Sequence, residues 1–403
     1  MRHFLVSRSM YRIKTFNRIA ERGLDRFHAD GYEVGADVSW PHAILLRSHK
    51  LGADDAQRGL LAVARAGAGT NNVPVDACTK RGIVVFNTPG ANANSVKELV
   101  LAAILLGSRD IIGGIKFVDG IPKDERDVHQ LVESNKKAFR GHEIQGRTLG
   151  IVGLGNIGSR VARAALDLGM DVVGYDPALS VSAAWRVPSQ VGQMESLQSL
   201  FQRSDYVSLH VPLTENTVGL VNRKSLKQFR DGAVLLNFAR EEVVNAEDTR
   251  DALVSGKLRW YFSDFPVAQL LGLPNVHCTP HLGASTGEAE ENCAVMAADQ
   301  IIEFLERGNV RNSVNFPDIS LDPSPGLRLA ITNTNVPTVL RQILSVLANR
   351  KINIIDMINK SRETVAYNLI DIEAEPDPYL LEEIEAIESV INVRVIGSGS
   401  AVM

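Results

Sequence analysis

The sequence has few of the features that mark several classes of protein. Its 403 residues include only three cysteines, Cys78, Cys278 and Cys293, whose wide spacing excludes a disulfide framework and a cysteine metal site. We interpret them as buried apolar residues in a reducing compartment, which we expect to be the cytoplasm. No apolar run approaches the length of a membrane span. The net charge of −4 comes with scattered basic residues, so we expect neither a nucleic acid nor a membrane as partner.

The N-terminal segment is unusual in its charge. Five basic residues precede the first acid, Glu21: Arg2, Arg8, Arg12, Lys14 and Arg18. A transit peptide has this composition, and the alternative is a short extension ahead of a start near Met10.

The length of 403 residues indicates two to three domains.

A glycine-rich segment, LGIVGLGNIG at residues 149–158, carries the clearest functional pattern. Gly153 allows a tight turn after a strand, Gly155 lets a pyrophosphate approach bare backbone, and Gly158 lets the next helix pack closely. The N-terminus of that helix faces the phosphates. Asp176, eighteen residues after Gly158, closes a second apolar run and suits the ribose hydroxyls of adenosine. Because a carboxylate repels a 2′-phosphate, the pattern predicts an NAD site.

Downstream of Asp176, apolar runs alternate with helical stretches, which is typical of a doubly wound parallel sheet with both faces covered. The predicted strands cover residues 206–211, 233–238, 258–262 and 276–279. Four polar residues lie at or just beyond their C-terminal ends: His210, Arg240, Asp264 and His281. Ligands of open α/β sheets bind outside those ends, so we expect these residues to be functional.

The flanking regions predict further elements. Strands are expected at 42–46, 60–66 and 83–86, and a helix to Leu106 with Ser95 as N-cap and Glu98 completing a capping box. Residues 113–146 are polar and charged and are expected to form a solvent-facing connection. Beyond a proline-rich linker, residues 327–396 read β-α-β-β-α-β, which is the ferredoxin-like arrangement.

Several motifs together resemble the D-isomer-specific 2-hydroxyacid dehydrogenase family, and within it the branch with a C-terminal ACT domain. They are Arg65–Val73, Arg81–Pro89, Ser95–Leu99, the glycine-rich segment, His210–Thr214, Leu236–Arg240 and Thr279–Thr286. The resemblance implies an α/β fold: a Rossmann-type doubly wound parallel sheet inserted in a flavodoxin-like substrate domain, plus a ferredoxin-like (βαββαβ) ACT domain. The implied boundaries are 1–91 with 285–317 for the substrate-binding domain, 92–284 for the NAD-binding domain, 318–325 for a linker and 326–403 for the ACT domain.

The resemblance also implies an activity. It is NAD-dependent oxidation of 3-phospho-D-glycerate to 3-phosphohydroxypyruvate, the first step of serine biosynthesis. His281 is then the acid/base, since an imidazole titrates near working pH, and Arg240 holds the carboxylate. The implied partners are a phosphorylated 2-hydroxy acid, an amino-acid effector such as serine at the ACT domain, and a second copy of the chain in a dimer or tetramer. The alternatives are another D-2-hydroxyacid dehydrogenase, or a non-catalytic NAD-binding regulatory protein, against which Arg240 and His281 argue.

By the same resemblance, the remaining site residues fall into three groups. The cofactor-binding candidates are Gly153, Gly155, Asn156, Ile157, Gly158, Asp176, His210, Pro212, Phe238, Ala239, Asp264 and Gly283. Arg47, Ser48 and Asn92 are the substrate-binding candidates, and Asn335 and Asn353 are the effector-binding candidates. Taken by themselves, Arg47 could be a surface cation, Arg240 could pair with Glu241 or Glu242, and the two asparagines could be turn residues.

The sequence departs from the family pattern at three positions. The family commonly has a Glu five residues after its nicotinamide Asp, hydrogen-bonded to the catalytic His; here that position is Gln269, which we carry as a candidate for orienting His281. Glu241 stands where the family usually has Gly, so the loop after Arg240 is expected to turn differently. Thr338 replaces the Gly of a Pro-Gly turn in the ACT domain and is expected to crowd the effector.

Overall fold

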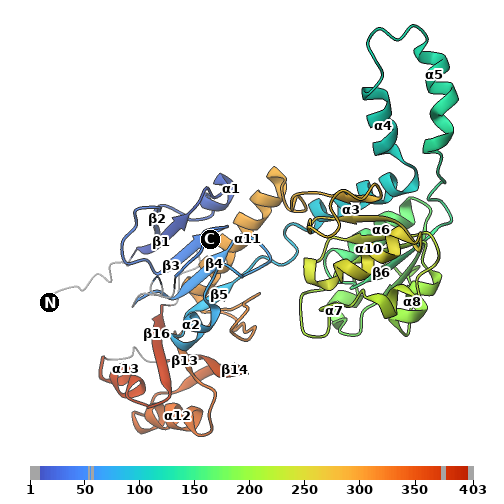
Figure 1. Cartoon of the computed structure of the whole chain (residues 1–403). Coiled ribbons are helices and arrows are strands. Elements are labelled where there is room, and N and C mark those ends of the chain that lie inside the picture. Colours follow the sequence, from blue (N-terminus) through green and yellow to red (C-terminus); the bar gives the residue numbers. More distant parts are fainter. Residues whose placement is uncertain (1–9, 53–54, 56–58, 374–377, 398–403) are drawn as a thin grey trace. The chain divides into compact units, whose positions relative to one another are not determined.

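A computed structural model describes residues 10–52, 55, 59–373 and 378–397. Their contacts divide the chain into two compact units, residues 93–286 and residues 1–92 with 287–403 (Figure 1). Residues 1–9, on which the two readings of the N-terminus depend, lie outside the described residues. The finer division into three domains and a linker stays a prediction.

Residues 93–286 form a doubly wound sheet of parallel strands in the order β12-β11-β10-β9-β6-β7-β8. The strands are β6 (Thr148–Val152), β7 (Asp171–Tyr175), β8 (Gly192–Gln193), β9 (Tyr206–Leu209), β10 (Ala233–Asn237), β11 (Leu258–Ser263) and β12 (Val276–Cys278). One face packs on α3 (Ala93–Ser108) and α6 (Gly158–Asp167). The other face packs on α8 (Leu197–Arg203), α9 (Arg223–Leu226) and α10 (Ala246–Val254). The short helix α7 (Val181–Ala184) and the 3₁₀ turn η3 (Glu241–Val243) also belong to this unit. The predicted Rossmann-type architecture is confirmed.

The first part of the other unit is a second parallel sheet, in the order β2-β1-β3-β4-β5 that flavodoxin-like folds share. Its strands are β1 (Tyr11–Phe16), β2 (Tyr32–Gly35), β3 (Ala43–Leu46), β4 (Ala62–Arg65) and β5 (Val84–Phe86), with helices α1 (Glu21–Leu24), α2 (Val75–Lys80) and α11 (Gly287–Arg307). The long α11 buries a stripe of small and apolar residues against α1 and β4, among them Ala294, Ala297 and Ile301. The sequence predicted β3, β4 and β5 but not β1 and β2.

One local prediction was wrong. Helix α3 begins at Ala93, so Ser95 is not its N-cap; instead the buried Ser95 Oγ donates to the carbonyl of Gly283 at 2.8 Å. The polar stretch after α3 faces solvent, as predicted, and it has secondary structure that the sequence did not predict. It forms α4 (Ile111–Asp119), α5 (Val128–Asn135) and the 3₁₀ turn η2 (Lys136–Phe139), which extend away from the sheet of their unit (Figure 1). Asp110 and Asp127 cap α4 and α5, which is how charged residues support helices here.

The C-terminal module is the predicted ferredoxin-like fold. Its antiparallel sheet has the order β14-β15-β13-β16, and its helices α12 and α13 cover one face. The elements are β13 (Leu327–Thr334), α12 (Val339–Asn349), β14 (Ile354–Arg362), β15 (Val365–Ile372), α13 (Pro378–Glu385) and β16 (Val390–Ile396).

The opposite face of this sheet shares a core with the flavodoxin-like part. Tyr367 and Leu369 pack in one cluster with Phe304 and Phe316, and the Tyr367 hydroxyl donates to the carbonyl of Gly308 at 2.9 Å. The buried Arg328 pairs with Asp371 at 2.7 Å and also donates to the carbonyls of Arg307, Leu321 and Asp322. The contacts therefore place the module in the same compact unit as α11.

Thr338 stands in a strained backbone position at the start of α12. Its φ is 78°, in the left-handed region, and its side chain makes no capping hydrogen bond. A left-handed conformation costs an L-residue about 1–2 kcal/mol, and more for a β-branched residue. Thr338→Gly is therefore expected to raise the free energy of unfolding by about 1 kcal/mol, measured as a higher urea midpoint.

Ser345→Gly is the matched control for that variant. Ser345 is exposed in the interior of the same helix, where glycine has no strain to relieve and is expected to destabilise by about 1 kcal/mol. Equal shifts in both variants would show that the conformation of Thr338 stores no strain.

Candidate functional site

The glycine loop, Gly153–Gly158, connects β6 to α6 at the point where the strand order reverses. Gly153 has a φ of +93°, and a Cβ there would lie 2.5 Å from the carbonyl oxygen of His210. A Cβ on Gly158 would lie 2.0 Å from the carbonyl oxygen of Gly153, so the helix can begin against the loop only because residue 158 is Gly. Nothing lies within 4 Å of a Cβ built on Gly155, which leaves its backbone open. Asn156 and Ile157 complete the loop, with Ile157 at the N-cap position of α6.

Asp176 and His210 flank the glycine loop at the ends of β7 and β9. The Asp176 carboxylate accepts from the backbone N–H groups of Leu154 at 2.8 Å and Ala178 at 3.0 Å. His210 Nε2 lies 2.8 Å from Ser208 Oγ, while its buried Nδ1 has no hydrogen-bond partner among the described residues. Burial lowers the pKa of His210 to about 3, so the imidazole is neutral at working pH.

These residues fit a dinucleotide. An open backbone at Gly155 before a helix N-terminus suits the pyrophosphate, and the negative charge of Asp176 suits a ribose without a 2′-phosphate. The unpaired Nδ1 of His210 is a buried polar atom that a bound group can satisfy. When NAD binds here, it supplies a hydride acceptor.

The predicted functional side chains gather at one edge of the sheet. His210 directly follows β9, Arg240 lies three residues after β10, Asp264 directly follows β11 and His281 lies three residues after β12. These four strands are neighbours and parallel, so their C-terminal ends form one continuous edge. The edge also carries the glycine loop, which follows β6.

Arg240 is held by its backbone and keeps its charge unpaired. The amide of Asn237, a fully buried residue, donates to the Arg240 carbonyl at 2.9 Å. The guanidinium donates to the carbonyl of Ala239 at 2.6 Å, and no ion pair joins it to Glu241 or Glu242 in the described residues. Glu241 begins the 3₁₀ turn η3 without a positive φ, so the loop has no need of the Gly that the family has there.

Asp264 organises the loop that carries His281. The carboxyl group is 3% exposed and accepts from Thr279 Oγ1 at 2.6 Å, from Leu282 N at 2.6 Å and from Gly283 N at 2.7 Å. Its carbonyl accepts from the backbone N–H of His281 at 3.1 Å. His281 itself has a φ of 56°, a strained conformation of the kind that clusters at functional sites.

The other cofactor and catalytic candidates divide by exposure. Phe238, Ala239 and Gly283 are buried at the sheet edge, whereas Pro212 is exposed. Gln269 is also exposed, and no hydrogen bond joins it to His281 in the part of the chain that the structure describes. Its orienting role therefore stays a prediction that no contact supports.

The three substrate-binding candidates lie in the other unit. Arg47 and Ser48 directly follow β3, and Asn92 is half-buried ahead of α3. The Arg47 guanidinium pairs with the Glu290 carboxylate at 2.8 Å, with both side chains near 40% exposed (38% and 42%). An exposed pair of this kind is weak, so an anionic ligand can compete for Arg47.

The sequence analysis missed the residue that holds this loop. Asn17, directly after β1, has a φ of 64°, and its Oδ1 accepts from the backbone N–H groups of Ser48 at 3.1 Å and His49 at 2.6 Å. The His49 ring stacks on Phe16 with 4.1 Å between centroids. An Asn that follows a strand is the available signal, since Asn tolerates the left-handed region, but β1 itself was not predicted.

The effector candidates have different surroundings. Asn335 donates to the carbonyl of Glu363 at 3.0 Å, and its backbone N–H donates to the carbonyl of Thr364, so it already holds a turn. Asn353 is exposed ahead of β14. Effector binding at either residue remains a prediction.

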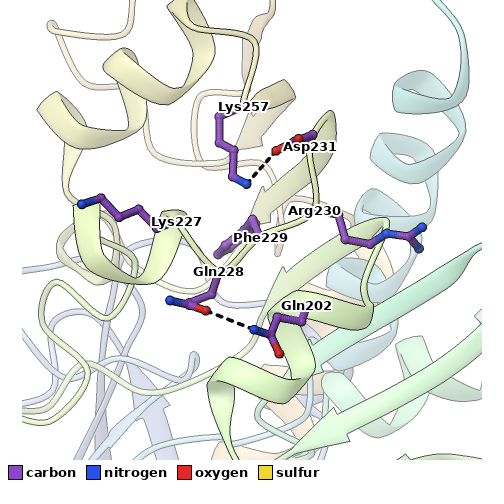
Figure 2. A pocket seen from close by; sticks show the side chains of 7 residues that line it. All are labelled: Gln202, Lys227, Gln228, Phe229, Arg230, Asp231 and Lys257. Atoms are coloured by element: carbon purple, nitrogen blue, oxygen red, sulfur yellow. Dashed lines mark hydrogen bonds and ion pairs between the residues drawn. The ribbon is translucent and has the colours of Figure 1, made fainter.

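A cavity of about 380 Å³ lies at the opposite end of the Rossmann-type sheet (Figure 2). It is lined by Gln202 from the end of α8 and by Lys227, Gln228, Phe229, Arg230, Asp231 and Lys257 from the segments that precede β10 and β11. Arg230 pairs with Asp205 at 3.0 Å and Lys257 with Asp231 at 2.7 Å. Because the glycine loop is at the other edge of the sheet, this cavity is not part of the candidate site.

None of the helices in the described ranges has the length and apolar character needed to cross a membrane. The same ranges hold no cluster of three or more His, Cys, Asp or Glu side chains that could bind a metal ion.

Comparison with known proteins agrees with this geometry. Residues 115–283 match the sequence model of the D-isomer specific 2-hydroxyacid dehydrogenase NAD binding domain. D-3-phosphoglycerate dehydrogenase of Haemophilus influenzae is 33% identical over 97% of this chain and 98% of its own length. The Escherichia coli enzyme of the same name is 34% identical over 91% of this chain and 90% of its own length.

A solved structure shows the same fold. The NAD⁺-bound 3-phosphoglycerate dehydrogenase of Entamoeba histolytica aligns with a TM-score of 0.60 and 26% identity, over 76% of this chain and 99% of that one. Together with the full-length relatives, this shows that the chain belongs to the D-isomer-specific 2-hydroxyacid dehydrogenase family and is an NAD-dependent oxidoreductase.

Proposed function

We propose that this enzyme oxidises 3-phospho-D-glycerate to 3-phosphohydroxypyruvate with NAD. The observation that carries the proposal is that Arg240 and His281 both follow strands of the sheet edge that bears the glycine loop. Arg240 forms no ion pair with another described residue, and Asp264 holds the strained backbone of His281. The full-length relatives named D-3-phosphoglycerate dehydrogenase support the choice of substrate.

The residues have separate tasks in this reaction. His281 accepts the proton of the substrate hydroxyl at an imidazole nitrogen. Arg240 binds the carboxylate through two parallel N–H groups and polarises the carbonyl oxygen as it forms. The glycine loop and Asp176 would hold NAD, which would supply the acceptor for the hydride on the carbon that bears the hydroxyl. Arg47 and Ser48 bind the distal phosphate, with Asn92 beside the substrate.

A substrate panel tests the proposal. NADH formation is measured with 3-phosphoglycerate, glycerate, lactate and 2-hydroxyglutarate, each with NAD. We expect the highest kcat/KM with 3-phosphoglycerate. A higher value for another 2-hydroxy acid would assign the chain to a sister dehydrogenase, and no turnover of any of them would favour a non-catalytic NAD-binding protein.

Arg47 allows a sharper test of the phosphate contact. A charge-assisted hydrogen bond contributes about 1.5–3 kcal/mol, so Arg47→Ala is expected to raise KM for 3-phosphoglycerate by about 10- to 100-fold. The kcat is expected to change little because Arg47 binds away from the reacting carbon. Glycerate, which lacks the phosphate, is the matched control, and its KM is expected to stay the same in the variant. An unchanged KM for 3-phosphoglycerate would contradict the phosphate assignment.

The same proposal includes assembly and location. We infer a cytoplasmic homo-oligomer, a dimer or tetramer, with an amino-acid effector such as serine at the C-terminal ferredoxin-like module, acting as an ACT domain. The resemblance of the module supports this. Because the side chain of Thr338 stands where the family often has Gly and crowds the approach to α12, we expect serine inhibition weaker than the resemblance alone suggests.

A further inference from the structure

The imidazole of His281 has no hydrogen-bonded neighbour that would orient it in the described residues. Neither a carboxylate nor Gln269 bonds to the ring there, and the side chain is exposed. Its ring neighbour is Phe265, with 5.0 Å between the centroids and 60° between the planes. Rings at this distance make a favourable tilted contact.

The backbone of His281 is fixed independently of that contact. The three donors to the Asp264 carboxylate, Thr279 Oγ1, Leu282 N and Gly283 N, lie on both sides of His281 in the chain. No hydrogen bond from another described residue to the ring restricts rotation of the imidazole about its side-chain bonds.

Phe265 is itself held in place. Its backbone N–H donates to Ser263 Oγ at 3.0 Å, and Ser263 is 1% exposed at the end of β11. Pro266 follows, and the residue before a proline is restricted to extended conformations. The backbone that carries the Phe265 ring is therefore fixed beside the loop that carries His281.

We propose that Phe265 is the positioning residue for His281. Its ring limits the rotation of the imidazole and keeps a nitrogen directed at the substrate hydroxyl, which is the task for which Gln269 was a candidate. Because the ring is uncharged, it orients the imidazole without stabilising the imidazolium as a carboxylate does. This inference rests on the proposed function, since it takes His281 as the acid/base.

The test compares Phe265→Ala with Phe265→Tyr. A misplacement of 1 Å can cost about 10²-fold in rate, so Phe265→Ala is expected to lower kcat by about 10-fold or more with little change in KM. Phe265→Tyr keeps the ring and is expected to restore kcat. No charge is added or removed, so the pH at which the oxidation rate falls in acid is expected to stay the same in both variants.

Phe117→Ala is the matched control. Phe117 on α4 makes a similar ring contact, 5.5 Å from Phe139, in the same unit but away from the sheet edge. Its loss is expected to leave kcat unchanged, and thermal unfolding of all variants shows that each is folded. A normal kcat in Phe265→Ala, or a loss in Gln269→Ala as large as that in Phe265→Ala, would overturn the inference.

His281→Asn, measured beside these variants, separates the two levels of the proposal. If His281→Asn keeps full activity, the proposed function fails. If it loses activity while Phe265→Ala does not, only the role of Phe265 fails.

Discussion

Replacing His281 with Asn is expected to lower kcat for oxidation by about 10²- to 10⁴-fold, the range that general acid–base groups contribute. Asn keeps a polar side chain and tolerates the φ of 56° that His281 adopts, so the loop held by Asp264 is expected to persist. What the variant loses is a group that takes a proton at working pH. The measurement is the initial rate of NADH formation at saturating NAD and substrate.

NADH binding is the control for the His281 variant. The glycine loop and Asp176 are distant in sequence from the altered side chain and keep their own contacts, so the Kd for NADH, followed by fluorescence, is expected to be unchanged. A full rate in His281→Asn would show that the substrate hydroxyl loses its proton to another group.

Replacing Arg240 with Ala is expected to lower kcat by about 10²- to 10³-fold, the cost of removing one donor that stabilises a developing oxyanion. KM is expected to rise as well, because the same guanidinium binds the carboxylate in the ground state. The variant is expected to fold, since Asn237 anchors the backbone carbonyl of Arg240 and the side-chain contact that is lost reaches only the carbonyl of the preceding residue, Ala239. Steady-state kinetics, with kcat and KM resolved, provide the measurement.

Arg240→Lys is the informative companion. A lysine keeps the charge but not the two parallel N–H groups, so we expect only partial recovery of kcat. Recovery to the parental rate would mean that charge alone acts at this position. A rise in KM with an unchanged kcat in Arg240→Ala would limit the residue to substrate binding.

The sequence predicts the parts of this fold that follow from short periodic patterns. The parallel strands β9 to β12, the glycine loop and the C-terminal βαββαβ order were predicted, and β16 was predicted with the bounds it has, Val390–Ile396. These elements have apolar runs bounded by glycine, proline or capping residues, which local reasoning detects. Strands β1 and β2 were not predicted, because their exposed and half-buried positions interrupt the apolar pattern.

The candidate site was predictable from the sequence only in part. Its positions at strand ends were predictable, but the contacts that hold them join residues distant in sequence. Asp264 bonds to the N–H of Gly283, Ser95 bonds to the carbonyl of Gly283, and Asn17 bonds to the N–H of Ser48. No rule of residue spacing predicts such hydrogen bonds. The same holds for Phe265, whose place beside His281 depends on how the loops after β11 and β12 meet.

The shared core beneath the C-terminal sheet affects how this chain can be shortened. Phe304 and Phe316 pack in one core with Tyr367, Leu369 and Ile396 of the C-terminal sheet. Arg328 of the same sheet donates to the carbonyl of Leu321, in the segment that leads to it. A protein ending near residue 317 would expose that apolar surface to water and leave Phe304 and Phe316 without their partners. The module is therefore a structural part of the unit that contains the flavodoxin-like sheet. A domain of another protein could replace it only if that domain brought a matching apolar face.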